Sequence, residues 1–265
     1  MTLTGRIVVV ISAGTEWRCV KDLLQPTALG RTPFGESFQH ALGGEPLTFC
    51  HGGWGKIDAA AAAQFCITSL GAALLVNLGT CGGIRGRAVK GDLFLIERTV
   101  VYDILERMAD PDEALRHYTT ELDTSWLQGA LPAGLRRATM LSADRDGRPE
   151  DVAGLVQQHD ARIVDWESGA IARVCALNRT PCLILRGVSD VFDATGGEAT
   201  GDLGAYREGT RTVMPRPARD APRVDQRGPT LALTGSRRRR SVSGRACAGA
   251  SGGGRSRPGG AGRTP

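Results

Sequence analysis

Acidic side chains follow short apolar runs at two places in this chain of 265 residues. Asp165 and Glu167 come after the run at 162–164, and Asp190 follows the continuous apolar run at 182–185. Continuous apolar runs are typical of buried parallel strands, and open α/β sheets bind ligands outside the carboxyl ends of their strands. Carboxylates brought to that edge could serve as a general acid and a general base. The alternative is that Glu167 is a helix N-terminal charge and Asp190 a turn residue.

Two further strand ends carry features suited to ligand chemistry. The strand predicted over 6–12 leads to Glu16, in a helix that we expect Thr15 to cap. The strand predicted over 73–78 leads into the glycine cluster Gly79–Gly83, where backbone N–H groups can approach a ligand closely. The coincidence of four such strand ends favours one shared site over four unrelated features.

Motifs for common cofactors and metals are missing from the sequence. Gly55-Lys56 resembles the end of a P-loop, but Cys50 and Ile57 stand where that motif requires Gly and Ser or Thr. No G-x-G-x-x-G follows the first predicted strand, and the four histidines show no paired ligand spacing. We therefore expect neither a cofactor nor a metal ion.

The alternation of strands and helices predicts one α/β domain over residues 1–214. We expect a three-layer α/β/α sandwich with a mixed, mostly parallel central sheet. Strands are predicted near 6–12, 45–50, 73–78, 91–98, 138–142, 162–165 and 182–187, and helices near 16–25, 56–70, 149–158, 167–178 and 202–214.

The long segment 98–127 interrupts this rhythm. It contains Tyr102, Tyr118 and Trp126, a high local density in a chain whose aromatic content is 5%. Long connections are usually functional or disordered. The aromatic residues favour an ordered, functional loop near the site or at a subunit contact.

The chain changes character after Met214. Residues 215–265 contain 12 Arg, no Lys, 2 Asp, 10 Gly and 6 Pro, including the run Arg237–Arg240. The segment thus carries a charge of +10 and leaves −5 for residues 1–214. It has too few large apolar side chains to offset the entropy of ordering, so we predict disorder. Its composition is also typical of a GC-rich coding sequence translated out of frame; any nucleic-acid contact by this basic tail would be nonspecific.

Cysteine usage and hydropathy bear on the compartment. Seven cysteines contain no C-x-x-C pair and mostly occupy apolar patterns, so we interpret them as reduced core residues of a cytoplasmic protein. No segment reaches the roughly 20 apolar residues needed to span a bilayer. The N-terminus enters a strand directly, without the features of a secretory signal.

Taken together, these segments resemble the purine nucleoside phosphorylase superfamily, and within it the 5′-methylthioadenosine/S-adenosylhomocysteine nucleosidases. The matching segments, in the family's order over about residues 6–214, are IVVVISAGTEW, GGWGKIDAAAAAQF, VNLGTCGG, KGDLFLIERTVVYD, LSADRD, VDWESGAIA and LRGVSDVFD. The resemblance implies cleavage of the N-glycosidic bond of a purine nucleoside with release of the free base. It also implies a homodimer acting on a small molecule.

The resemblance assigns roles to particular residues. Asp190 would protonate the leaving purine near N7, and Glu16 would hold and activate water. Glu167 would bind the ribose hydroxyls, with Trp166 as an apolar wall beneath the sugar. The remaining implied substrate-binding residues are Gly79, Thr80, Cys81, Gly82, Asp146 and Ser189.

Two departures from the family pattern leave alternatives open. Asn77 precedes Thr80 where phosphorylases have an arginine, which favours hydrolysis over phosphorolysis. However, Trp17 and Arg18 follow Glu16 in place of further acids, and an Arg18 that faces the site would favour a phosphate-dependent phosphorylase. The last helix also stops at Pro215, so a catalytically weakened nucleoside-binding relative is a third possibility.

Overall fold

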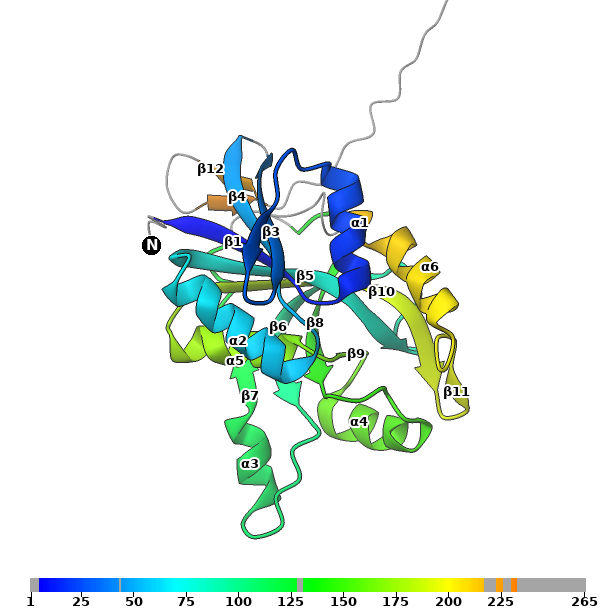
Figure 1. The fold of residues 1–265 in the computed structure, drawn as a ribbon. Helices are drawn as coiled ribbons and strands as arrows, with labels where there is room; N and C mark the ends of the chain where they lie inside the picture. The colour runs from blue at the N-terminus through cyan, green and yellow to red at the C-terminus, as the bar shows by residue number, and fades with distance from the viewer. Residues whose placement is uncertain (1–4, 43, 128–130, 217–222, 226–229, 233–265) are drawn as a thin grey trace, which may run out of the picture. The chain divides into compact units, whose positions relative to one another are not determined.

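The computed structural model describes residues 5–42, 44–127, 131–216, 223–225 and 230–232 (Figure 1). The strands are β1 (Arg6–Ile11), β2 (Gly30–Thr32), β3 (Gly35–Leu42), β4 (Glu45–His51), β5 (Ala72–Ile84), β6 (Leu93–Val101), β7 (Thr119–Glu121), β8 (Leu135–Ser142), β9 (Ile163–Asp165), β10 (Cys182–Asp193), β11 (Gly196–Gly197), β12 (Arg223–Asp225) and β13 (Thr230–Ala232). The helices are α1 (Gly14–Leu24), α2 (Gly55–Thr68), α3 (Pro111–His117), α4 (Val152–His159), α5 (Ser168–Leu177) and α6 (Leu203–Val213), with a short 3₁₀ turn at Pro149–Asp151.

One mixed sheet organises the described residues. Its strand order is β11-β10-β6-β8-β9-β5-β1-β4-β3-β2, with β7 paired to β6. Strand β10 also pairs with β5, so β5, β10, β6, β8 and β9 form a closed ring of pairings. The pairings β1–β4, β1–β5, β5–β10, β6–β8 and β8–β9 are parallel, and the others in this sheet are antiparallel. The protein is therefore an α/β protein with a mixed sheet, as the alternating pattern predicts.

Strand β1 is buried on both faces, which explains its uninterrupted apolar sequence. Val8 and Val10 pack in one core cluster with residues of α2 and α5. Val9 packs in a second cluster with Trp17 and Val20 of α1. Burial of each such aliphatic side chain contributes about 1.5–3 kcal/mol relative to exposure. The sheet is thereby fixed between two groups of helices, α2 with α5 and α1 with α6 (Figure 1).

Strands β5 and β10 run further than the sequence predicts. The expected loop Gly79–Gly83 is the second half of β5, and Ser189 and Asp190 lie within β10. The parallel pairing continues through this region, with Gly82 opposite Asp190. A Cβ on Gly83 would lie 2.9 Å from a methyl of Val188, so glycine permits the strands to stay together where a side chain would separate them.

Several local predictions need correction. Helix α1 begins at Gly14 with Ala13 at the N-cap, and Thr15 does not cap it; the Glu16 carboxylate accepts the Ala13 N–H at 3.3 Å instead. Strands β2 and β3 were not predicted, because their partly exposed, mostly polar sequences lack a continuous apolar run. Segment 98–127 contains the end of β6, α3 and β7.

The predicted tail is described only in part. Pro215, Arg216 and the antiparallel strands β12 and β13 belong to it. Residues 217–222, 226–229 and 233–265 lie outside the described residues, so the predicted disorder stays a prediction. Among the described residues, no helix combines the length and apolar content that crossing a bilayer requires.

Candidate active site

A cavity of about 650 Å³ lies where β5, β9 and β10 meet the N-terminal turns of α1 and α6, a volume typical of small-molecule sites. Nine of the predicted site residues line it: Glu16, Thr80, Cys81, Gly82, Asp146, Trp166, Glu167, Ser189 and Asp190. Strand ends far apart in sequence thus contribute to one cavity. Gly79, the tenth predicted site residue, does not line the cavity.

The Glu16 side chain extends from the first turn of α1 onto β5. Its Oε1 accepts the Thr80 N–H at 2.5 Å and the Thr80 hydroxyl at 2.8 Å. Glu16 is only 5% exposed, and this burial raises its pKa, while Arg186 and the Thr80 donors oppose the rise. The carboxyl is therefore fixed in place and can exchange a proton nearer neutral pH than an exposed glutamate can.

The structure answers the question of register in this helix. Trp17 is buried in the core and donates its Nε1–H to the Glu36 carboxylate at 2.7 Å. Arg18 is exposed and donates to the Thr15 hydroxyl at 3.1 Å. Neither side chain lines the cavity, whereas Glu16 does.

Gly79 allows Glu16 and a buried arginine to approach the strand. A Cβ at this position would lie 3.0 Å from Glu16 Oε1 and 3.1 Å from the guanidinium carbon of Arg186. Such contacts are tighter than most Cβ atoms make, so glycine at this position leaves Glu16 and Arg186 the space that they occupy.

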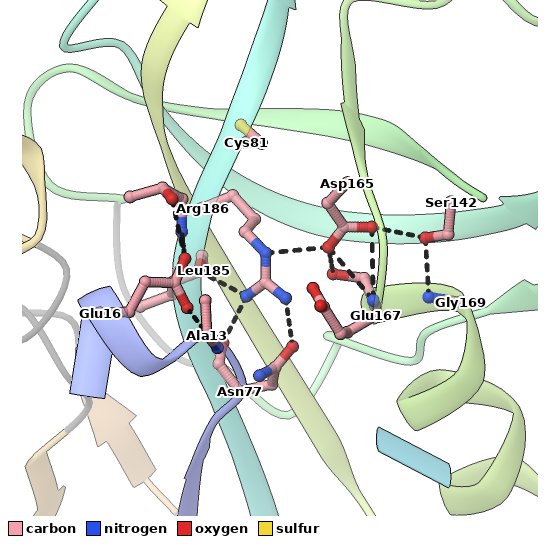
Figure 2. Close-up of polar contacts among 12 residues, drawn as sticks. Ala13, Glu16, Asn77, Cys81, Ser142, Asp165, Glu167, Gly169, Leu185 and Arg186 are labelled. Carbon is pink, nitrogen blue, oxygen red and sulfur yellow. Dashed lines mark hydrogen bonds and ion pairs between the residues drawn. The ribbon is translucent and has the colours of Figure 1, made fainter. Parts of the chain in front are cut away.

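Arg186 on β10 is the largest fully buried side chain of the protein's described part. Its Nε–H donates to Asp165 Oδ2 at 3.0 Å, and its Nη2–H donates to Asn77 Oδ1 at 2.5 Å (Figure 2). Its Nη1–H donates to the carbonyl oxygens of Leu185 and Asn77. The arginine therefore ties β5, β9 and β10 together beneath the cavity.

Asp165 serves this network and is not a free acid. Besides Arg186, its carboxylate accepts from the Ser142 hydroxyl at 2.6 Å (Figure 2). It also accepts from the N–H and the hydroxyl of Ser168. The Ser142 hydroxyl accepts the Gly169 N–H at 2.8 Å. With its acceptor positions used, Asp165 holds the start of α5, and the acid/base candidate of this strand end is Glu167.

Glu167 lies at the N-cap position of α5 and is 9% exposed. Its Oε1 accepts the Gly55 N–H at 3.1 Å, and no lysine or arginine in the described part of the chain forms an ion pair with it. Burial raises its pKa to about 8, and the charges of Asp165 and Glu16 add to this rise. The carboxyl thus retains unused hydrogen-bonding capacity toward the cavity.

This raised pKa leads to a prediction about stability. Between about pH 4.5 and pH 8, folded Glu167 holds a proton that the unfolded chain releases, so the free energy of unfolding falls as pH rises. Glu167→Gln removes that dependence. Across this window, we expect the free energy of unfolding of the variant to rise relative to that of the wild type by up to about 1.4 kcal/mol per pH unit. Urea unfolding at several pH values measures the difference, and parallel profiles for the two proteins would contradict the prediction.

Asp190 faces the same cavity from β10. Its Oδ1 accepts the Ser189 hydroxyl at 2.6 Å, and this hydroxyl also lies 3.3 Å from the Cys81 carbonyl oxygen. Burial raises the pKa of Asp190, with opposing contributions from Ser189 and Lys90. A carboxyl that keeps its proton to higher pH is suited to donate it to a leaving group.

The charge of the cavity wall has one sign. The charged residues that line it are Glu16, Asp146, Asp165, Glu167, Asp190 and Asp202, and this described wall contains no Lys, Arg or His. A phosphate dianion would be repelled here, whereas a neutral molecule that develops positive charge would be stabilised.

The structure adds residues that the sequence interpretation missed. Trp54, Phe192 and Tyr206 line the cavity, and Arg186 supports it from below. Arg186 had a usable signal, since a charged residue within an otherwise apolar buried strand requires a partner. Tyr102, Tyr118 and Trp126 do not line the cavity, and Tyr102 packs against a small core cluster. Asp103 of the same segment contacts Lys56 and accepts the Asp144 N–H, so the predicted location near the site stays a prediction. A role in a subunit contact stays a prediction.

Metal ligation has no support among the described residues. No group of three or more His, Cys, Asp or Glu side chains there is arranged to hold a metal ion.

Comparisons with known proteins identify the family of this chain. The family model described as the phosphorylase superfamily matches residues 7–211, and the chain belongs to this family. A nucleosidase for 5′-methylthioadenosine and S-adenosylhomocysteine from Treponema pallidum is 25% identical over 183 residues, covering 57% of this chain and 68% of the relative. The corresponding nucleosidase of Geobacillus kaustophilus is 28% identical over 176 residues, covering 59% and 72%.

A solved structure supports the fold. The Neisseria meningitidis 5′-methylthioadenosine/S-adenosylhomocysteine nucleosidase, in complex with methylthio-immucillin-A, superimposes with a TM-score of 0.65. The match covers 82% of this chain and 96% of that one at 20% identity. At this identity the likeness establishes a common fold.

Proposed function

We propose that the protein is a nucleosidase, which hydrolyses the N-glycosidic bond of a purine nucleoside and releases the free base. The substrate is 5′-methylthioadenosine, S-adenosylhomocysteine or a related adenine nucleoside. The observation that carries the proposal is the opening of Glu16, Glu167 and Asp190 into one cavity without a cationic wall residue. The curated relatives bear the same activity in their names.

Asp190 acts on the base. Breaking the bond between C1′ and the purine nitrogen leaves the bonding electrons on the purine. Transfer of the Asp190 proton to N7 neutralises that charge, so the base leaves as a neutral molecule. The burial that raises the pKa of Asp190 keeps this proton available, and Ser189 orients the carboxyl through its hydroxyl.

Glu167 and Glu16 act on the sugar. The ribose becomes positively charged as the base leaves, and Glu167 accepts hydrogen bonds from its hydroxyls. A nearby positive charge favours ionised carboxylates, so the acidic wall stabilises the transition state more than the substrate. Glu16 holds a water molecule; the water oxygen bonds to C1′ as Glu16 takes up its proton.

Hydrolysis and phosphorolysis differ in their need for phosphate. We expect 5′-methylthioadenosine to yield free adenine at the same rate with and without inorganic phosphate, because the described residues of the cavity wall include no cation to bind phosphate and Arg186 is already paired. Turnover that requires phosphate would establish a phosphorylase. Binding of the nucleoside without any release of adenine would establish a catalytically inactive relative.

We also infer the finer organisation of the chain. Residues 1–214 are the catalytic domain, a three-layer α/β/α sandwich with a mostly parallel sheet, supported by the parallel pairings of β1 and by helices packed against both of its faces. Residues 215–265 are a basic tail of out-of-frame origin; the coding DNA tests this, since a helix-forming continuation in another frame is expected.

We infer that the protein is a cytoplasmic homodimer. Large apolar side chains are exposed at Ile57 (82%), Leu105 (70%) and Met108 (98%), and a second copy would cover them. The six described cysteines are free, and five of them are buried, in keeping with a reducing compartment. A monomer-sized species in sedimentation analysis would contradict the dimer.

A further inference from the structure

Two tryptophans form a stacked pair on the cavity wall. The ring centroids of Trp54 and Trp166 lie 5.0 Å apart, with the ring planes inclined by 21°, and both residues line the cavity. Trp166 is half-buried, whereas Trp54 is 67% exposed. An indole that is held against a second indole and remains two-thirds exposed offers a free aromatic face to a ligand.

The pair adjoins the position of the sugar. Gly55 donates its N–H to Glu167 Oε1 at 3.1 Å, and Trp54 and Trp166 are the residues that precede the two partners of this bond. Asp190 has other carboxyl neighbours, Asp146 and Glu198. In the proposed binding mode, the base lies at Asp190 and the ribose at Glu167. Because the tryptophans adjoin Glu167, they face the part of the substrate that extends from the ribose away from the base. That part is the 5′ substituent.

The surroundings of the pair disfavour an anionic substituent. Lys56 follows Trp54 and Gly55, but its Nζ is held by Asp103 at 2.5 and 2.6 Å. Lys56 does not line the cavity, and the described wall offers no cation to a carboxylate arm. The tryptophan surface is thus apolar and planar, with an electron-rich face.

We propose that Trp54 and Trp166 bind a planar aromatic 5′ substituent, so the protein prefers adenine nucleosides with a 5′-aryl group to those with a small 5′-alkyl group. The inference rests on the proposed function and names the substrate class of the same cavity. Offset stacking of one aromatic ring on another adds binding free energy beyond the area buried. A phenyl group also covers more apolar surface than a methyl group. Together these effects predict a preference of about tenfold or more in kcat/KM.

Three adenosine derivatives test this preference. Adenine release is measured from 5′-phenylthio-5′-deoxyadenosine, 5′-methylthio-5′-deoxyadenosine and adenosine, which differ only at the 5′ position. The wild type is compared with Trp54→Ala and Trp54→Phe. Leu177→Ala is the matched control, because Leu177 is 68% exposed, ends helix α5 and does not line the cavity. Gel filtration of each variant reports its oligomeric state.

We expect the wild type to favour the phenylthio compound by about tenfold over the methylthio compound. Trp54→Ala should remove most of this ratio, because it lowers turnover of the phenylthio compound more than turnover of adenosine. Trp54→Phe should keep most of the ratio, and Leu177→Ala should match the wild type. Equal turnover of the two thio compounds by an active wild type overturns this inference and leaves the proposed function in place. An equal loss on all three nucleosides in Trp54→Ala, with a change of oligomeric state, shows that Trp54 is a subunit contact and also overturns it. No adenine from any nucleoside overturns the proposed function instead.

Discussion

Replacing Asp190 by Asn is expected to reduce release of the base by about 10²–10⁴-fold while the fold stays intact. In the wild type, the Ser189 hydroxyl donates to Asp190 Oδ1 at 2.6 Å. The amide of the variant has the shape of the carboxyl, and its oxygen can still accept this hydrogen bond. It has no proton of suitable acidity, so the purine would leave as an anion. The loss should therefore fall on kcat more than on KM.

The leaving group separates a catalytic role of Asp190 from a binding role. A riboside whose leaving group departs readily without protonation, such as 4-nitrophenyl riboside, should lose far less in Asp190→Asn than a purine nucleoside does. Asp193→Asn is the control, because Asp193 lies on the same strand, pairs with Arg85 and does not line the cavity. Purine release by Asp190→Asn within tenfold of the wild type would remove Asp190 from the mechanism.

The acidic residues of the site could be predicted because strand ends can be recognised locally. A continuous apolar run predicts a buried parallel strand, and the following residue then lies at the ligand-binding edge. Glu16, Glu167 and Asp190 could be found in this way, and the structure brings all three to one cavity.

Features that depend on pairing between distant segments could not be predicted in the same way. The second halves of β5 and β10 contain glycine and polar residues typical of loops, and only their mutual pairing makes them strands. The partners of Arg186 are remote in sequence, at Asn77 and Asp165. Closure of the ring of strands decides both features, and no single segment contains that information.

Loss of the buried arginine should have the largest effect on stability. We expect Arg186→Met to lower the free energy of unfolding by about 3–5 kcal/mol, because it leaves the Asp165 carboxylate buried without its cation. The side chains of Arg186 and Asp165 are 2% and 3% exposed, so water cannot replace the lost partner. Urea unfolding of the two proteins measures the difference.

An exposed ion pair supplies the control for this prediction. Arg85→Met breaks the contact with Asp193. The side chains of Arg85 and Asp193 are 53% and 30% exposed, and such exposed pairs contribute about 0–1 kcal/mol to stability. A similar small loss in Arg186→Met would show that water or a rearranged Asn77 solvates Asp165.

The double variant Arg186→Met with Asp165→Asn distinguishes loss of the pair from loss of packing. The amide at 165 carries no charge, so it removes the unpaired carboxylate while retaining an oxygen for the Ser142 and Ser168 donors. We expect it to regain a large part of the stability lost in the single variant. Arg186 also lowers the pKa of Glu16, so activity in the double variant should fall even where stability returns. A double variant as unstable as Arg186→Met would instead assign the loss to the shape of the arginine side chain beneath Gly79.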